Sequence, residues 1–276
     1  MAEITAEMVR KLRERSGLPM MDCKKALAQT HGDAEAAYEL LRKSGAAAAE
    51  KKAGRETGEG RVGVFIDKAK GIAALAVMRC ETAPVANNPD FKELAAKVAK
   101  HVALTGCTDV DALLTQKHVD GGPTIQDMLH DLLNRIRENM KVARVVRHTG
   151  RVAAYVHHDG KLGVLLVVEG EGGDDALLND VCMHIAAMSP MATNRQDIPK
   201  DVVAKEEEIA REQVRASGKP ENMLDKILVG KMNRWFGDHV LTEQAFVKDD
   251  KKTVGQVLKA AGLTAKTFAR ISVGGE

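Results

Sequence analysis

The chain has 276 residues, with 41 basic and 39 acidic side chains, so its net charge is only +2. A protein that binds nucleic acid through phosphates usually has a larger and clustered excess of Lys and Arg. Aromatic residues, which could stack on bases, make up only 3% of the chain. Composition therefore argues against direct binding to nucleic acid. No run of about 18 apolar residues occurs, so we expect no membrane-spanning helix.

The cysteines favour an intracellular protein with reduced thiols. Cys23, Cys80, Cys107 and Cys182 are far apart and form no C-x-x-C pair. A disulfide framework or a zinc site would need closer or regular spacing. The N-terminal stretch mixes charges, whereas a secretory signal places a basic segment before an apolar one. We therefore expect a cytoplasmic protein that holds no metal or other cofactor.

The first 45 residues predict three short helices that share one small core. Thr5 and Asp33 are suitable N-caps for the first and third helices, and Pro19 suits the start of the second. The apolar spacing carries the third helix up to Gly45. The stretch that follows, "AAAAEKKAGRETGEG", favours a helical extension that fades into a linker.

The rest of the chain contains an internal repeat. Residues 60–77 and 150–168 each predict two antiparallel strands joined by a turn, because alternating apolar residues lead to Gly-containing turns and then to apolar runs. The similar patterns "VAKHVA" and "VCMHIA" then predict a helix in each copy. His101 and His184 occupy matching positions in these helices, and a packed helix histidine is the plain interpretation of both.

The first copy of the repeat is longer between strand and helix. From Gly71 to Val98 there are 27 positions, but from Gly163 to Val181 only 18, so nine extra residues fall in "CETAPVANNPDF". Long connections in compact domains are usually functional or disordered. We expect a protruding loop that can reach a partner, and a bland insertion is the alternative.

Three further segments complete the prediction. Residues 123–140 predict one amphipathic helix that ends at Met140, and residues 199–237 predict an antiparallel helical hairpin that turns at Ser217–Pro220 and projects into solvent. The last segment, from Thr253, predicts a helix and a strand that returns to a sheet. No nucleotide-binding loop, metalloprotease motif or catalytic triad can be assembled. We therefore do not expect an enzyme.

Five blocks of the chain, in order, resemble the elongation factor Ts family, whose members exchange guanine nucleotide on elongation factor Tu during translation. The blocks are "LRERSGLPMMDCKKAL", "LRKSGAAAAEKKAGR", "MHIAAMSP", "ASGKPENM" and "QAFVKDDKKTVGQVL". The resemblance covers nearly the whole chain. Because the sequence ends at "ISVGGE", we expect the additional C-terminal helical module of some members to be absent.

The resemblance implies an α+β fold. It begins with a three-helix, ubiquitin-associated-like module, continues with two similar antiparallel α+β subdomains, and includes an inserted antiparallel helical hairpin. The corresponding division is 1–55 for the N-terminal module and its linker, 56–146 for the first subdomain and 147–276 for the second. The hairpin is expected at about 199–237.

The resemblance also implies which residues contact elongation factor Tu. Arg13, Met20 and Met21 would do so from the N-terminal module, where adjacent methionines can adapt to an apolar groove of the partner. Met21 is also expected to serve the core of that module. His184 would support the interface from the second subdomain, and a further contact surface would lie around Val247.

The extra residues of the first copy correspond to a family motif, Thr-Asp-Phe-Val, which disturbs the magnesium and nucleotide site of the partner. Here the motif is Thr82, Ala83, Pro84 and Val85, with Ala and Pro in place of Asp and Phe. The loop is therefore expected to act by position and backbone, because Pro84 has a fixed φ and biases Ala83 toward extended conformations. In the competing hypothesis the loop is a relic, and exchange depends on the surface near His184.

Two other functional classes stay open on the sequence. The first 45 residues alone match a ubiquitin-associated-like binding module, although this leaves the later blocks unexplained. The same helices match a helix-turn-helix for nucleic acid, against which the charge balance argues.

Overall fold

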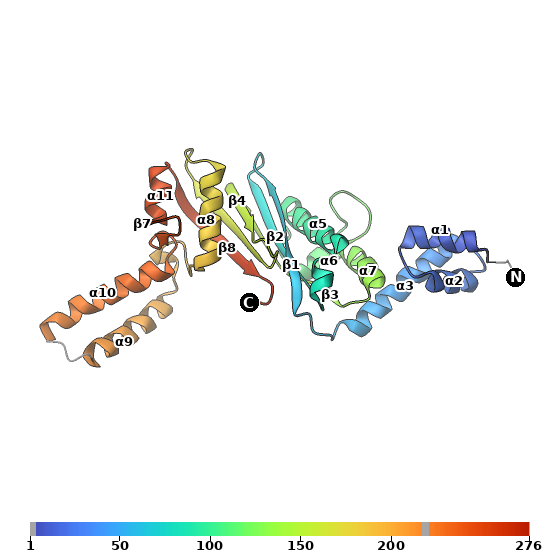
Figure 1. The fold of residues 1–276 in the computed structure, drawn as a ribbon, viewed down its shortest axis with the longest axis horizontal. Helices are drawn as coiled ribbons and strands as arrows, with labels where there is room; N and C mark the ends of the chain where they lie inside the picture. Colours follow the sequence, from blue (N-terminus) through green and yellow to red (C-terminus); the bar gives the residue numbers. More distant parts are fainter. Residues whose placement is uncertain (1–3, 217–220, 276) are drawn as a thin grey trace. The chain divides into compact units, whose positions relative to one another are not determined.

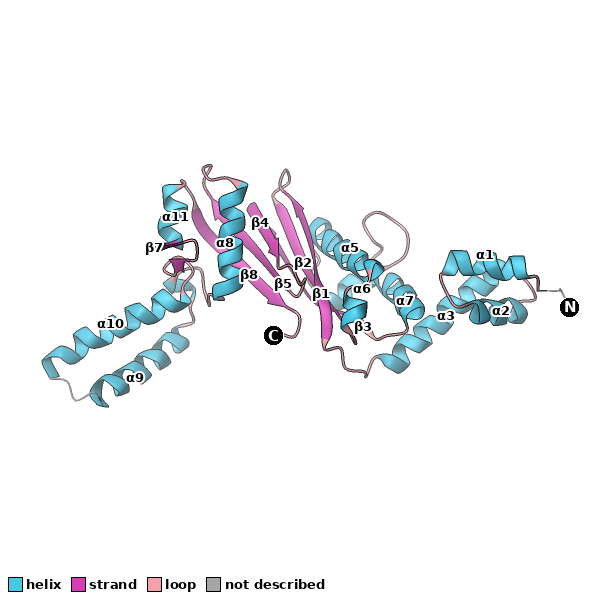
Figure 2. Ribbon diagram, viewed as in Figure 1, coloured by secondary structure: helices cyan, strands magenta, loops and turns pink. Residues whose placement is uncertain are grey.

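The computed structural model describes residues 4–216 and 221–275, which form a mixed fold of helices and antiparallel strands (Figures 1 and 2). The chain divides into two compact units. Unit 1 contains Met1–Phe65, Ala74–Arg147 and Ser272–Glu276, and unit 2 contains Ile66–Ala73 and His148–Ile271. The α+β expectation is confirmed, and the finer division at residues 55 and 146 stays a prediction.

Three helices form the N-terminal head, as the sequence predicts. They are α1 (Ala6–Ser16), α2 (Met20–Gln29) and α3 (Ala34–Lys52). The Thr5 side chain accepts a hydrogen bond from the Met8 amide, and the Asp33 carboxylate accepts from the amides of Glu35 and Ala36. The head has its own small core, made of Val9, Leu12, Cys23, Ala26, Leu27, Ala37 and Leu41.

Helix α3 continues past Gly45, where the sequence pattern suggested an end. Gly45 is buried, and a Cβ atom there would lie 1.5 Å from the side-chain amide nitrogen of Asn134 on α7 (Ile125–Ile136). The glycine therefore lets α3 cross close to α7 instead of terminating the helix. The predicted helical extension is confirmed to Lys52.

Unit 1 is built on a three-stranded sheet in the order β1-β2-β3, with helices packed against it (Figure 2). Gly63 on β1 lies so close to α5 that a Cβ atom would be 2.1 Å from the carbonyl oxygen of Ala95. The elements are β1 (Glu59–Asp67), β2 (Ile72–Cys80), α4 (Ala83–Ala86), α5 (Pro89–Thr105), α6 (Val110–Thr115), α7 and β3 (Met140–Thr149). The predicted first hairpin and its helix are confirmed.

The helix predicted over 123–140 is too long. Helix α7 ends at Ile136, because Arg137 adopts a left-handed conformation with φ 69° and its amide donates to the carbonyl of Leu133. Met140 instead opens β3, in which Met140 and Val142 are buried. The apolar spacing of a helix and the alternation of a strand overlap at this point, so the pattern alone did not separate them.

Unit 2 repeats the plan of unit 1. Its sheet has the order β4-β5-β8, and β4 pairs antiparallel with β5 from Arg151↔Val168 to Val156↔Gly163. The predicted second hairpin, its helix and the returning C-terminal strand are therefore confirmed. The elements are β4 (Arg151–Val156), β5 (Leu162–Glu169), α8 (Asp175–Met188), η1 (Arg195–Asp197), β6 (Ala245–Phe246), β7 (Asp249–Thr253), α11 (Val254–Ala260) and β8 (Thr264–Ser272).

The helical hairpin consists of α9 (Lys200–Ala216) and α10 (Glu221–His239), which lie side by side (Figure 1). The predicted turn at Ser217–Pro220 lies outside the described residues. Ile209, Met223 and Val229 are exposed along the hairpin, in agreement with a narrow apolar seam. At its base, Trp235 and Phe236 pack against a small core with Ile198 and Val240.

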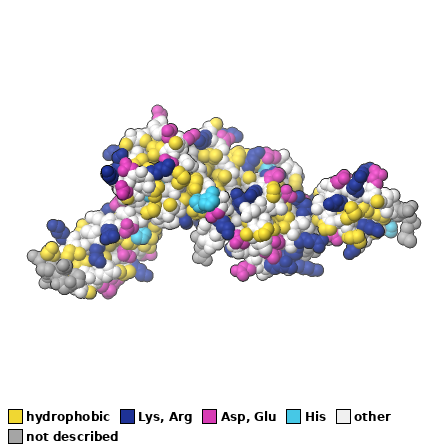
Figure 3. Space-filling view, in the orientation of Figure 1, with side chains coloured by type: hydrophobic (Ala, Val, Ile, Leu, Met, Phe, Trp, Pro, Cys, Tyr) yellow, Lys and Arg dark blue, Asp and Glu magenta, His cyan; other side chains and the backbone are white. Residues whose placement is uncertain are grey.

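Charged side chains of both signs are interspersed over the visible surface (Figure 3). This agrees with the near-neutral net charge of the chain. Within residues 4–216 and 221–275, no helix is both long and apolar enough to cross a membrane.

Candidate partner-binding surfaces

The head presents two adjacent methionines to solvent. Met20 and Met21 form the first turn of α2, and they are 50% and 60% exposed. The expectation that Met21 serves the core is wrong, because α2 buries Cys23, Ala26 and Leu27 instead. Arg13 is exposed in the last turn of α1. An exposed pair of flexible thioethers is suited to an irregular apolar groove on a partner.

The segment Thr82–Val85, which we expected to be a protruding loop, is largely helical. It forms the start of α4, a single helical turn, after which Asn88 caps α5 by accepting a hydrogen bond from the Asp90 amide. The extended residue is Thr82, with φ −129° and ψ 153°, whereas Ala83 already belongs to the helix. The expected extended conformation at Ala83 is therefore wrong, and the chain turns one residue earlier. Below, Thr82–Val85 is called the Thr82 segment.

The Thr82 segment is buried on one side and exposed on the other. Val85 and Ala86 are buried, while Ala83 and Pro84 are exposed. The thiol of Cys80 contacts the carbonyl oxygen of Thr82 at 3.3 Å. Burial, reinforced by the nearby negative charge of Glu138, raises the pKa of this thiol to about 11, so it stays protonated and acts as a weak donor.

The structure shows where β2 and β5 start, and counting from these residues changes the number of extra residues in the first copy. There are 26 positions from Ile72, where β2 starts, to Val98, and 19 from Leu162, where β5 starts, to Val181. The excess is therefore seven residues and not nine. These residues build α4 and lengthen the N-terminal end of α5, so the insertion is folded structure.

His184 is fully buried in α8 and holds the chain at Val247. Its Nδ1 accepts a hydrogen bond from the Val247 amide at 3.3 Å, which leaves the Nε2–H to donate to Oε1 of Gln244 at 3.0 Å. Burial lowers the pKa of His184, so the ring is kept neutral. The Val247 side chain is 48% exposed. His184 thus supports this surface from inside, and Val247 is the residue that a partner can touch.

Unit 1 contains the same arrangement around His101. Its Nδ1 accepts from the Val119 amide at 3.2 Å and its Nε2 lies 2.8 Å from Oε1 of Gln116. The glutamines were missed from the sequence, although "QKHV" at 116–119 and "QAFV" at 244–247 share the Gln-x-x-Val spacing. Matching helix histidines were visible, but only the fold brings each one to its Gln-x-x-Val partner.

Comparisons with known proteins agree with this architecture. A family model described as "Elongation factor TS" matches residues 81–275. The chain belongs to the elongation factor Ts family. Elongation factor Ts of Hydrogenovibrio crunogenus is 43% identical over 273 residues, covering 98% of this chain and 92% of that protein. The elongation factor Ts proteins of Idiomarina loihiensis and Aquifex aeolicus are 44% and 39% identical, over 98% and 99% of this chain and 91% and 98% of theirs.

The structure shows how two of the four residues Thr82–Val85 are held in place. Thr82 and Val85, which agree with the usual Thr-Asp-Phe-Val pattern, are fixed by a hydrogen-bonded carboxylate and by burial. Ala83 and Pro84, which depart from it, are exposed, as is Thr82 itself.

No cluster of three or more metal-ligating side chains occurs in the described part of the chain. The Thr82 segment lies in unit 1 together with the head, whereas His184 and Val247 lie together in unit 2.

Proposed function

We propose that this member of the elongation factor Ts family is the guanine-nucleotide exchange factor for elongation factor Tu. It would bind the GDP-bound partner, loosen Mg²⁺ and GDP, and allow GTP to enter during translation elongation. The observation that carries the proposal is similarity to elongation factor Ts proteins along nearly the whole chain. The motif at Thr82–Val85, which the family places near the nucleotide site of the partner, gives further support.

Exchange needs no covalent step by this chain. A phosphate loop and a magnesium ion hold the nucleotide on a GTPase, and both must loosen before release. A factor that binds the nucleotide-free state more tightly than the nucleotide-bound state weakens nucleotide binding by the same ratio, because the coupling is reciprocal. Equal affinity for both states would change nothing. We accordingly propose that the chain is not an enzyme in the bond-making sense and needs no cofactor of its own.

In this proposal, three surfaces of the chain contact the partner, each with a different role. The head, which we propose to be a ubiquitin-associated-like module, docks through Arg13, Met20 and Met21. The surface at Val247 makes a second contact, supported from within by His184. The Thr82 segment acts on the magnesium and nucleotide site, by steric displacement, because Ala83 and Pro84 offer neither a carboxylate nor an aromatic ring.

The chain is proposed to act in the cytoplasm, through protein–protein contact, without binding nucleic acid or a membrane directly. Its net charge of +2 and the interspersed surface charges support a partner other than a phosphate backbone (Figure 3).

The experiment is release of a fluorescent GDP from elongation factor Tu, followed with and without the chain. The proposal expects a rate that rises with the concentration of the chain and saturates. The chain alone, assayed under the same conditions, should hydrolyse no GTP. An unchanged release rate at stoichiometric concentration would refute the function.

A further inference from the structure

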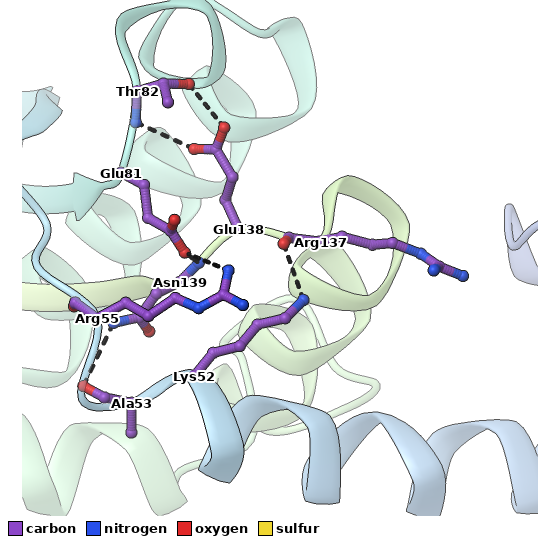
Figure 4. Close-up of polar contacts among 8 residues, drawn as sticks. All are labelled: Lys52, Ala53, Arg55, Glu81, Thr82, Arg137, Glu138 and Asn139. Carbon is purple, nitrogen blue, oxygen red and sulfur yellow. Dashed lines mark hydrogen bonds and ion pairs between the residues drawn. The ribbon is translucent and has the colours of Figure 1, made fainter.

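Three consecutive residues, Arg137–Asn139, connect α7 to β3 and contact both the head and the Thr82 segment (Figure 4). We call them the junction segment. All of these contacts lie within unit 1. The junction segment thus connects the linker after α3 with the residues just before α4.

On one side, Glu138 holds Thr82 with both carboxylate oxygens. The Thr82 amide donates to Oε2 at 3.0 Å, and the Thr82 hydroxyl donates to Oε1 at 2.7 Å. Both bonds are charge-assisted, and two bonds to one residue fix its orientation as well as its place. Because Thr82 directly precedes the exposed Ala83 and Pro84, its orientation sets the direction in which α4 starts.

On the other side, Asn139 holds the linker that leaves α3. Asn139 is 5% exposed, and its side-chain amide donates to the carbonyl oxygens of Arg55 at 2.8 Å and Ala53 at 3.3 Å. Its backbone amide donates to Oε1 of Glu81 at 2.6 Å, and Glu81 also pairs with Arg55 at 3.5 Å. One buried asparagine thus ties the linker to the residue before Thr82.

Arg137 adds two contacts to the head itself. Its carbonyl oxygen accepts a hydrogen bond from Lys52, the last residue of α3, at 2.8 Å. Its guanidinium pairs with Asp22 on α2, two residues from the exposed Met20. The junction segment therefore reaches from the docking helix of the head to the start of α4.

We propose that the junction segment sets the position of the Thr82 segment relative to the head, and that Glu138 is a positioning residue for nucleotide exchange. The inference rests on the proposed function. A head docked on the partner fixes one end of this network, and the two bonds from Glu138 deliver Ala83 and Pro84 to a defined place. A segment held in its working position loses less conformational entropy when it acts.

Substitutions at Glu138 separate position from charge. Glu138→Gln keeps the length of the side chain, and its oxygen accepts from the Thr82 amide while its NH₂ donates to the hydroxyl, which can act as an acceptor. Glu138→Asp keeps the charge but is too short to reach both groups. We expect Glu138→Asp and Glu138→Ala to slow GDP release at saturating concentration about tenfold, and Glu138→Gln less than about threefold. Partner affinity should stay within about threefold in all three variants, because Glu138 makes no docking contact in this account.

Hydrogen exchange of the Thr82 amide in the free protein gives a readout that needs no partner. We expect protection in the wild type and in Glu138→Gln, and its loss in Glu138→Ala. Glu169→Ala is the matched control, because the one contact described for Glu169 is its ion pair with Lys266 in unit 2. This variant should change neither the rate of GDP release nor the protection of the Thr82 amide. Thermal unfolding of each variant identifies any that fail to fold.

Asn139→Ala tests the other side of the segment. It loosens the head end of the network while Glu138 still holds Thr82, so we expect slower GDP release at saturation with the protection of the Thr82 amide kept, and unchanged release would contradict the inference. The inference is overturned if the Glu138 variants match the wild type, if Glu138→Asp is active and Glu138→Gln is not, or if affinity, release and stability fall in parallel. If the wild type itself does not accelerate GDP release, the proposed function fails, whereas the hydrogen-exchange result still reports on the contact.

Discussion

Replacing both exposed methionines of α2 with alanine should weaken partner binding without harming the fold. Complete burial of a methionine side chain contributes about 1.5–3 kcal/mol. Met20 and Met21 are 50% and 60% exposed, so only about half of each remains to be buried on docking. Together they should contribute about 2 kcal/mol, which corresponds to about a 30-fold rise in the dissociation constant. Calorimetric titration of elongation factor Tu with the double variant measures it.

The matched control is Met223→Ala on α10, because Met223 is 46% exposed and belongs to no proposed surface. Its affinity and its thermal stability should equal those of the wild type. If the Met20/Met21 double variant keeps its affinity within about twofold while its fold is intact, the head does not dock through α2, and the reasoning is refuted.

Three other changes have definite expected outcomes. Pro84→Gly increases the conformational entropy that α4 must lose by about 1 kcal/mol, so GDP release at saturation should fall about fivefold while the affinity measured by calorimetry stays the same. An equal loss of release and affinity would contradict action by position. Gly63→Ala places a Cβ atom 2.1 Å from the Ala95 carbonyl oxygen, so urea unfolding should show a loss of about 3 kcal/mol, whereas Gly58→Ala, with nothing near, should show little; equal stabilities would mean that β1 and α5 are not in close contact. Burial lowers the pKa of His184, so the folded state favours the neutral ring. The free energy of unfolding should therefore be constant above the ordinary pKa near 6.5 and should decline as the pH falls below it. His184→Gln should reduce this decline, measured by urea unfolding between about pH 7.5 and 5.5.

The sequence predicted elements well where pattern and punctuation agree. Both hairpins have Gly-containing turns between apolar strands, and both repeat helices show a clear apolar face, so their existence and order were correct. The Thr5 and Asp33 caps were also predictable, because capping depends on residues close in sequence. These features are decided locally, within a few residues of chain.

Features decided by distant contacts were predicted poorly. Gly45 looked like a helix end, but it is small because α3 passes close to Asn134. Met140 looked like the last apolar position of a helix, but it opens β3, which pairs beside β2, a strand far away in the sequence. Nothing near either residue in the sequence reports these contacts.

The candidate site shows the same limit. The resemblance marked Thr82–Val85, but it did not distinguish the supporting residues Thr82 and Val85 from the exposed pair between them. Glu138 lies 56 residues from Thr82 in the chain, so its two hydrogen bonds to Thr82 are visible only in the folded structure. In the same way, the resemblance marked both His184 and Val247, and only the folded structure shows that His184 is fully buried whereas the Val247 side chain is exposed.

The central claim is that the chain accelerates nucleotide exchange on elongation factor Tu by binding, with no chemistry of its own. The most direct measurement is the release of fluorescent GDP from excess elongation factor Tu in the presence of a substoichiometric amount of the chain and free GTP. The account predicts that each molecule of the chain discharges many molecules of GDP and is recovered unchanged. Release at the intrinsic rate of the partner, at this and at stoichiometric concentration, would contradict the account.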